Sequence, residues 1–318
     1  MSKTIVIYSY FEKNDEYIKN FKFFLDNALY NDIDYIFCIN GHKCSIDIPK
    51  QSNINILNRD NIDFDFGAYR DALKTIDINI YTYYFFINTS VRGPFLPNEQ
   101  RKNIRWTEPF VKLLTNDTKL VGTTINILNA IDPEIQKSMS LNLLIEKGYK
   151  PPFPHVQSQM FLLHKDGLHF LISKQFFNQS NENNFNKFIA LREVLMSQLI
   201  LKNGWNINCI LPKYQGLDYR TINKDINSTS VHGDAYYPNA YFGNDIKPYD
   251  VIFIKTNRGV STDEIIKLTD QYYIYNANKT NYIEPFTNKF SFSDYLNRHM
   301  TLYYNTHNSG KSMYTINL

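Results

Sequence analysis

Apolar and polar positions along this chain form blocks that match strands and amphipathic helices. Residues 4–9 and 34–40 are short apolar runs of the kind that form buried strands, and residues 80–87 form an aromatic and β-branched run of the same kind. Residues 16–30, between the first two runs, place phenylalanine and leucine side chains on one side of a helix. This strand–helix–strand rhythm predicts a parallel, right-handed wound sheet.

The remaining blocks extend this pattern along the chain. Further strands are expected at residues 54–57, 119–124, 160–163, 206–211 and 248–255. Further helices are expected at residues 68–74, 109–114, 131–147, 167–174 and 190–203. The predicted fold class is therefore α/β, with a single-lobed, mostly parallel wound sheet flanked by helices. We expect one catalytic domain at residues 1–258, with residues 259–318 as a C-terminal helical extension packed on it.

Polar chemistry is densest within residues 58–95. A polar turn that carries Asp63 and Asp65 opens this stretch, a helical run follows, and the buried strand after it ends abruptly in a polar triplet that begins at Asn88. Buried strands of parallel sheets bind ligands at their carboxyl ends. The sequence therefore predicts a functional site at this edge of the sheet.

Composition excludes several classes of function. The 318-residue chain is 43% hydrophobic, which fits a globular protein rather than a disordered one. A net charge of +3 is too mild for a nucleic-acid-binding protein. Three cysteines provide neither a disulfide framework nor a four-ligand zinc site. No apolar run reaches the ~18 residues of a membrane span, and no export signal is recognisable, so we expect a cytoplasmic protein.

Four motifs carry a family resemblance. They are DFGAYRDAL at residues 65–73, NTSVRGPFLP at 88–97, PHVQS at 154–158 and PYDVIFIKTNR at 248–258. In this order they resemble a glycosyltransferase-like group related to the rhamnan-synthesis F type, and the surrounding pattern resembles the nucleotide half of A-type (GT-A) glycosyltransferases. The likeness covers about residues 4–258. It implies a GT-A-like fold and transfer of a sugar, with inversion, from a nucleotide-diphosphate sugar to a glycan or another hydroxyl acceptor.

A glycosyltransferase must first hold its donor nucleotide. Tyr8 and Ser9, at the end of the first strand, are candidates to face the base, and Asp63 or Asp65 could accept hydrogen bonds from base or ribose donors. The alternative is that these two aspartates cap the helix that follows them. Through the motifs, the resemblance adds further donor-binding candidates, namely Tyr69, Arg70, Asn88, Ser90 and Gln157.

The leaving diphosphate must also be neutralised. Where A-type enzymes chelate a divalent cation with Asp-x-Asp, this chain has an Asn-Thr-Ser triplet that begins at Asn88 and offers no carboxylate. Mn²⁺ and Mg²⁺ prefer charged oxygen ligands. One arrangement is a cation held by Asp65, His232 and Asp234.

The other arrangement is a set of fixed cations. Arg92, Lys255 and Arg258 could bind the diphosphate directly, since arginine can hold phosphate oxygens with two parallel hydrogen bonds. Lys255 and Arg258 could instead be a surface pair at the end of a strand. The sequence leaves the choice between metal and clamp open.

Glu193 and His155 are the candidate general bases. Glu193 lies near the expected start of the helix at residues 190–203, where inverting A-type enzymes place an acidic base, and a helix start lowers the pKa of a carboxylate. His155 is the rival, in an extended segment whose Gln157 is expected to line the acceptor side with it. An ordinary structural role remains open for each.

Three functions stay open at this point. The first is a nucleotide-sugar-dependent glycosyltransferase. The second is a non-catalytic GT-A-like module that binds a nucleotide or a glycan, which the missing Asp-x-Asp supports. The third is a nucleotidyltransferase, which needs two or three convergent carboxylates for metal-assisted chemistry.

Overall fold

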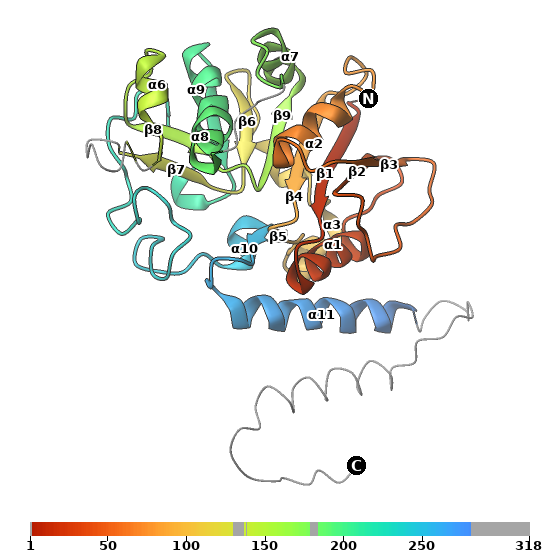
Figure 1. Cartoon of the computed structure of the whole chain (residues 1–318). Helices are drawn as coiled ribbons and strands as arrows, with labels where there is room; N and C mark the ends of the chain where they lie inside the picture. The colour runs from red at the N-terminus through yellow and green to blue at the C-terminus, as the bar shows by residue number, and fades with distance from the viewer. Residues whose placement is uncertain (1, 130–136, 138, 179–183, 281–318) are drawn as a thin grey trace. The chain divides into compact units, whose positions relative to one another are not determined.

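The structure is a computed structural model that describes residues 2–129, 137, 139–178 and 184–280 (Figure 1). The chain divides into two compact units, Met1–Ile265 and Ile266–Leu318. The first unit contains every predicted site residue. The second begins within α11 (Thr262–Thr280) and is described only as far as the end of that helix. The predicted domain boundary at residue 258 stays a prediction.

A seven-stranded sheet in the order β10-β6-β9-β4-β1-β2-β3 forms the centre of the first unit. Neighbouring strands run parallel except β9, which is antiparallel to both β4 and β6. The strands are β1 (Thr4–Phe11), β2 (Asp34–Asn40), β3 (Ile54–Arg59), β4 (Tyr83–Asn88), β6 (Thr118–Gly122), β9 (Met160–His164) and β10 (Asn206–Cys209). Two antiparallel pairs accompany the sheet, β5 (Val91–Arg92) with β11 (Ile254–Lys255) and β7 (Ile125–Leu128) with β8 (Phe153–Val156).

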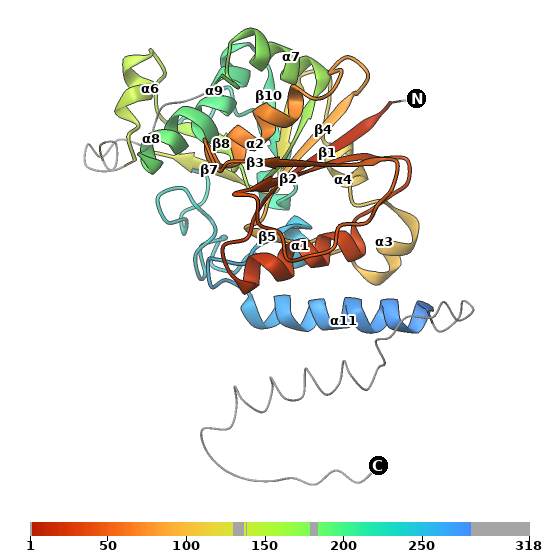
Figure 2. The ribbon, with the colours of Figure 1, turned by 45° about the vertical axis from the view of Figure 1, so that its right-hand side comes forward.

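Helices flank this sheet on both faces, with α1 on one side and α2 and α7 on the other (Figure 2). The helices of the first unit are α1 (Asp15–Asn27), α2 (Phe64–Leu73), α3 (Asn98–Asn103), α4 (Glu108–Lys112), α6 (Asn142–Glu146), α7 (Lys165–Ser173), α8 (Phe185–Ile189), α9 (Leu195–Lys202) and α10 (Pro248–Val251). The predicted fold class, α/β with a mostly parallel sheet flanked by helices, is thereby confirmed. None of the helices in the described ranges has both the length and the apolarity that a membrane span requires.

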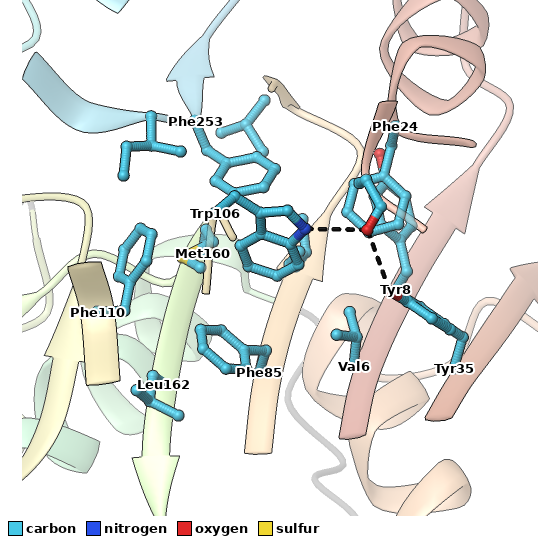
Figure 3. Close-up of a cluster of buried hydrophobic side chains, with 14 of the residues drawn as sticks. Val6, Tyr8, Phe24, Tyr35, Phe85, Trp106, Phe110, Met160, Leu162 and Phe253 are labelled. Carbon is cyan, nitrogen blue, oxygen red and sulfur yellow. Dashed lines mark hydrogen bonds between the residues drawn. The ribbon is translucent and has the colours of Figure 1, made fainter. Parts of the chain in front are cut away.

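An aromatic core fills the α1 face of the sheet. Trp106 lies among Phe85, Phe110 and Phe253, as Figure 3 shows, and its indole N–H donates to the backbone carbonyl of Ala28 at 3.0 Å. Each large side chain contributes up to a few kcal/mol of burial free energy, so this face holds the central strands rigidly. The core therefore provides a fixed base for the polar edge of the sheet.

The helix expected at residues 190–203 is longer and contains an irregular turn. It begins at Phe185 with α8, continues through a π-helical turn at Ala190–Val194 and ends with α9. Two hydrogen bonds connect this helix to β8: the Val156 N–H donates to the Ser197 hydroxyl at 3.0 Å, and the Gln198 side chain donates to the Pro154 carbonyl at 2.8 Å. π-Helical turns inside helices often occur at functional sites.

Residues 248–255 differ from the predicted strand. They form α10, followed by only two strand residues in β11. Proline is well suited to a first helical turn, where its missing N–H is not needed, and the Lys247 N–H donates to the Asp250 carboxylate at 2.9 Å. Residues 131–136 and 138 of the helix expected at 131–147 lie outside the described residues, and in the remainder only α6 and Lys137 are helical.

Candidate functional site

Polar side chains meet at the carboxyl edge of the sheet, where β1 and β4 end. Ser9 and Asn88 are register partners across these two strands. The Asn88 side chain donates to the Asp65 carboxylate at 3.0 Å, and its carbonyl oxygen accepts hydrogen bonds from the Ser90 N–H at 3.0 Å and the Ser90 hydroxyl at 2.6 Å. The Ser9 hydroxyl accepts a bond from Asn40 at 3.0 Å. Four of the predicted site residues are thus gathered at one edge.

Asp65 is held near the start of α2 by an unusual turn. Asp63 and Phe64, immediately before it, both have positive φ angles, 58° and 49°, which are uncommon for residues with side chains. Burial raises the pKa of Asp65 to about 6; the bond from Asn88 opposes this shift, and the charge of Glu193 adds to it. Asp65 is therefore close to changing its protonation state near neutral pH.

Asp63 has a different role from Asp65. Its carboxylate, only 4% exposed, forms a 2.5 Å ion pair with Arg70, and Arg70 also pairs with Asp71 at 2.8 Å. Asp63 is the N-cap residue of α2 by position, but its side chain makes no capping bond to the helix backbone. Arg59 completes this arrangement by bonding to Asp71 at 2.9 Å. These two arginines and two aspartates pair with one another and hold the turn before Asp65 in place.

Glu193 lies in the π-helical turn and is 9% exposed. One of its carboxylate oxygens accepts hydrogen bonds from the Ser158 N–H at 2.7 Å and from the Ser158 hydroxyl at 2.6 Å. The other lies 3.6 Å from His155 Nε2, while Nδ1 of the same ring contacts the Phe153 carbonyl oxygen at 3.0 Å.

These contacts determine the protonation of Glu193. Burial alone would raise its pKa, but the hydrogen bonds and charge of His155, the charge of Lys255 and the bond from Ser158 lower the pKa to about 2. The expected helix start does not account for this shift, because the helix begins eight residues earlier at Phe185. Glu193 is a firmly held anion.

Lys255 supplies positive charge at the same edge. Within the described part of the chain, no hydrogen bond or ion pair holds its ammonium group, which lies 5.6 Å from the centre of the Tyr236 ring. Burial lowers the pKa of Lys255, while the negative charges of Asp234, Glu193 and Asp65 raise it. This ammonium group therefore faces three carboxylates without pairing with any of them.

Asp234 and Arg258 form a weaker pair near Lys255, with 3.4 Å between the guanidinium and the carboxylate. His232 is exposed on the turn before Asp234. Among the residues described here, no three His, Cys, Asp or Glu side chains are close enough to hold a metal ion. The ligand set predicted from the sequence, Asp65, His232 and Asp234, is therefore not assembled.

Three other predicted site residues are structural. The Tyr8 ring is 1% exposed and packs against Phe21 and Phe24, so it belongs to the core and offers no surface to a nucleotide base. Tyr69 is fully buried among aromatic rings on the opposite face. Arg92 is 3% exposed and bonds to Glu16 at 2.7 Å and to Asn20 at 3.0 Å, both on α1. Arg92 is thus unavailable for the predicted diphosphate clamp.

Gln157 and its neighbours form a polar network that the sequence only partly indicated. Gln157 is buried and accepts a bond from the Thr124 hydroxyl at 2.6 Å. The Gln159 side-chain amide donates to the hydroxyl groups of Thr123 at 2.8 Å and Thr124 at 3.1 Å, and the backbone carbonyl of Gln159 accepts from the Asn88 N–H at 3.0 Å. The PHVQS motif pointed to this loop. No signal in the sequence indicated Gln159 or the two threonines.

A cavity of about 310 Å³ lies elsewhere on the first unit. Its walls come from residues that follow α6 and α7, from the π-helical turn and from α9: Lys147, Tyr149, Lys174, Gln175, Phe176, Leu191, Arg192, Leu195 and Leu199. None of the predicted site residues lines it. The candidate site rests on the polar edge described above rather than on this cavity.

No protein-family model matches the chain, and no curated protein matches it. Several solved structures are distantly similar to this chain. The catalytic domain of Drosophila beta1,4galactosyltransferase 7, in complex with xylobiose, is 8% identical with a TM-score of 0.34, over 68% of this chain and 66% of that one. A glycosyltransferase involved in glycosylation of the major capsid of PBCV-1 is 11% identical with a TM-score of 0.35, over 86% of this chain and 100% of that one. The WbbM bifunctional glycosyltransferase is 8% identical with a TM-score of 0.30, over 65% of this chain and 38% of that one. At TM-scores below 0.5, these likenesses carry no argument about what the chain does.

Proposed function

We propose that this chain is a glycosyltransferase that transfers a sugar, with inversion, from a nucleotide-diphosphate sugar to a hydroxyl group of a glycan or another acceptor. The proposal combines the motif resemblance to the rhamnan-synthesis F-related group with the chemistry of the sheet edge. One observation carries most of the weight, namely the ammonium group of Lys255.

An unpaired, half-buried ammonium group is costly for a folded protein unless a ligand uses it. Lys255 has no hydrogen bond or ion pair among the described residues and lies on β11, which pairs with β5 directly after the carboxyl end of β4, the end at which parallel sheets bind ligands. A diphosphate would provide the missing negative charge, and Arg258, exposed three residues later, could share it. Lys255 would then stabilise the charge that develops on the leaving diphosphate. The assembled residues do not fit a metal chelate, so no step is assigned to a metal.

The general base is better assigned to Asp65 than to Glu193. A base acts best when its pKa is close to the working pH, and the pKa of Asp65 is raised to about 6 by burial, whereas that of Glu193 is lowered to about 2. Both carboxylates accept hydrogen bonds within the chain, Asp65 from the Asn88 side chain and the Phe66 N–H, and Glu193 from Ser158, so the pKa is what distinguishes them. In this proposal Asp65 takes the proton from the acceptor hydroxyl, and Glu193 fixes the loop of the PHVQS motif.

A non-catalytic binding module is the second candidate. The contacts of Glu193 favour it, because the carboxylate that the sequence predicted as a base is held by Ser158 and lies beside His155. The two candidates differ in turnover, since a binding module would hold a nucleotide sugar without releasing free nucleotide.

Lys255→Met tests the proposal. Affinity for UDP, GDP and dTDP, and for their hexose conjugates, is measured by isothermal titration calorimetry in excess chelator. We expect the parent to bind at least one nucleoside diphosphate and the variant to lose about tenfold or more in affinity, since a charge-assisted bond contributes ~1.5–3 kcal/mol. The melting temperature should not fall, because the lowered pKa means that the charged lysine destabilises the fold.

Lys3→Met is the matched control. Its ammonium group also lies over a tyrosine ring, 4.8 Å from the centre of Tyr81, but at the opposite edge of the sheet. Equal affinities in the parent and in Lys255→Met would contradict the proposal. Release of free nucleotide from the bound sugar conjugate, with an acceptor panel, separates the enzyme from the binding module.

A further inference from the structure

The cavity of about 310 Å³ has one apolar wall. It lies where α6 and α7 flank the helix that contains the π-helical turn and α9 (Figure 1). Leu191, Leu195 and Leu199 line the cavity from this helix, and all three side chains are only partly buried. Neighbouring leucines that stay open to a cavity leave hydrocarbon in contact with water, which is unfavourable unless a ligand covers it.

The cavity is also basic. Lys147 follows α6, Lys174 follows α7 and Arg192 lies in the π-helical turn, and no described acidic residue lines the cavity with them. Within the described ranges, none of the three pairs with a carboxylate. A positive charge at the end of a helix is favourable, which accounts for each lysine by itself. It does not account for the convergence of both lysines and Arg192 on one cavity.

Arg192 is the fixed member of this set. Its guanidinium group donates to the backbone carbonyl of Phe176, and to that of Asn178 at 2.6 Å, and lies 5.6 Å from the centre of the Phe176 ring. Burial lowers the pKa of Arg192, and Asp63, whose charge opposes this shift, is already paired with Arg70. Carbonyl groups are neutral, so these contacts hold Arg192 in place without neutralising its charge.

A phosphate ester with a hydrocarbon group matches this lining. A phosphate monoester carries more than one negative charge near neutral pH, so it suits three cations better than a carboxylate does. Arginine can hold phosphate oxygens with two parallel hydrogen bonds, and the lysines add point charges. A volume of about 310 Å³ is at the small end for ligand sites, which leaves room for the phosphate and a short hydrocarbon segment.

We propose that this cavity binds the phosphate group of a phosphorylated hydrocarbon, with Lys147, Lys174 and Arg192 around the phosphate and the three leucines against the hydrocarbon. The source is either a lipid headgroup or a soluble phosphate ester. The inference does not rest on the proposed function, because none of these residues belongs to the polar edge of the sheet. It concerns binding and assigns no bond formation or cleavage to the cavity.

Isothermal titration calorimetry with n-hexyl phosphate, inorganic phosphate and 1-hexanol tests the two halves of this ligand. We expect n-hexyl phosphate to bind the parent at least tenfold more tightly than either of the other two compounds, because only n-hexyl phosphate contacts both the cations and the leucines. Leu191→Gln should weaken n-hexyl phosphate about threefold or more and leave inorganic phosphate unchanged. No binding of n-hexyl phosphate, or binding no tighter than that of inorganic phosphate, would overturn the inference.

The double variant Lys147→Gln, Lys174→Gln tests the basic lining. Both lysines are exposed and make no hydrogen bond or ion pair within the described residues, so the melting temperature should change little. We expect at least a tenfold loss of affinity for n-hexyl phosphate. The matched control is Lys50→Gln, Lys112→Gln, which removes the same two charges from exposed positions outside the cavity and should have less than a twofold effect. Equal affinities in the two double variants would contradict the assignment.

Cosedimentation with vesicles of phosphatidylcholine, with or without phosphatidic acid, distinguishes the two sources. Retention only by vesicles that contain phosphatidic acid, lost in Lys147→Gln, Lys174→Gln but not in the control, supports a lipid headgroup. Binding of n-hexyl phosphate without retention by either vesicle supports a soluble phosphate ester. The affinity for UDP, GDP and dTDP should be the same in the parent and in both double variants, so failure of the proposed function would leave this inference standing, and the reverse also holds.

Discussion

Asp65→Asn should stabilise the protein while it removes activity. The folded state raises the pKa of this carboxyl to about 6, mainly because burial disfavours its charged form. In the unfolded chain the same group titrates at ~3.9. Between these two values the folded state binds more protons than the unfolded state, so Asp65 destabilises the fold progressively as pH rises from ~4 to ~6, and fully above that.

The magnitude follows from this difference. A shift of about two pKa units corresponds to about 3 kcal/mol of unfolding free energy. Asparagine carries no charge at any pH, and its side-chain carbonyl can still accept the bond from Asn88 that Asp65 now accepts at 3.0 Å. We expect the variant to be about 2 kcal/mol more stable than the parent at pH 8, and close to the parent at pH 4.5.

Urea unfolding at pH 4.5, 6 and 8, followed by tryptophan fluorescence, measures this difference. Trp106 in the aromatic core is a suitable reporter because it is fully buried. Asp60→Asn is the control, since Asp60 lies five residues away, is exposed and pairs with exposed His42, so its effect should stay below ~0.5 kcal/mol. A variant at Asp65 that is less stable than the parent at pH 8 would refute the reasoning and indicate a stabilising carboxylate.

Two further substitutions separate structure from chemistry. Glu193→Gln should lower the free energy of unfolding by about 2 kcal/mol, measured by urea unfolding. Glutamine has one acceptor oxygen and an amide group that donates, so it cannot accept from Ser158 and also face His155 with an acceptor. An unchanged midpoint would show that this carboxylate does not anchor the loop. Arg92→Met should lower the free energy of unfolding by about 1–3 kcal/mol, because the buried Asn20 side-chain oxygen loses the hydrogen bond from Arg92. It should change nucleoside diphosphate affinity by less than about twofold in calorimetry; a larger loss of affinity would return Arg92 to the diphosphate clamp.

The sequence pattern was most informative for the sheet. The strands that start at Thr4 and Asp34 were predicted at their observed first residues, because aromatic and β-branched runs bounded by polar residues leave few other structures open. Residues 248–255 show the limit of this argument. The apolar run there is short. Pro248 in the first helical turn and the bond from the Lys247 N–H to the Asp250 carboxylate favour a helical turn that periodicity alone does not reveal.

The site was only partly predictable, for a physical reason. Asp65, Asn88 and Ser90 lie at a strand end, and the rule that parallel strands bind ligands at their carboxyl ends gathered them. Tyr8 and Arg92 also lie near this end, but the strand's period of two residues directs Tyr8 into the core, and α1 supplies Arg92 with partners. Which face a side chain takes, and whether a distant element already uses its charge, depends on tertiary packing.

The π-helical turn at Ala190–Val194 makes the position of Glu193 depend on a single residue of chain length. Such a turn contains one residue more than the corresponding α-helical turn, and losing that residue would rotate the preceding part of the helix by about 100° relative to α9. Deletions here would therefore be far more damaging than substitutions, although the helix itself would become more regular. We therefore expect this helix to tolerate a change in length less well than a change in the identity of most residues along it.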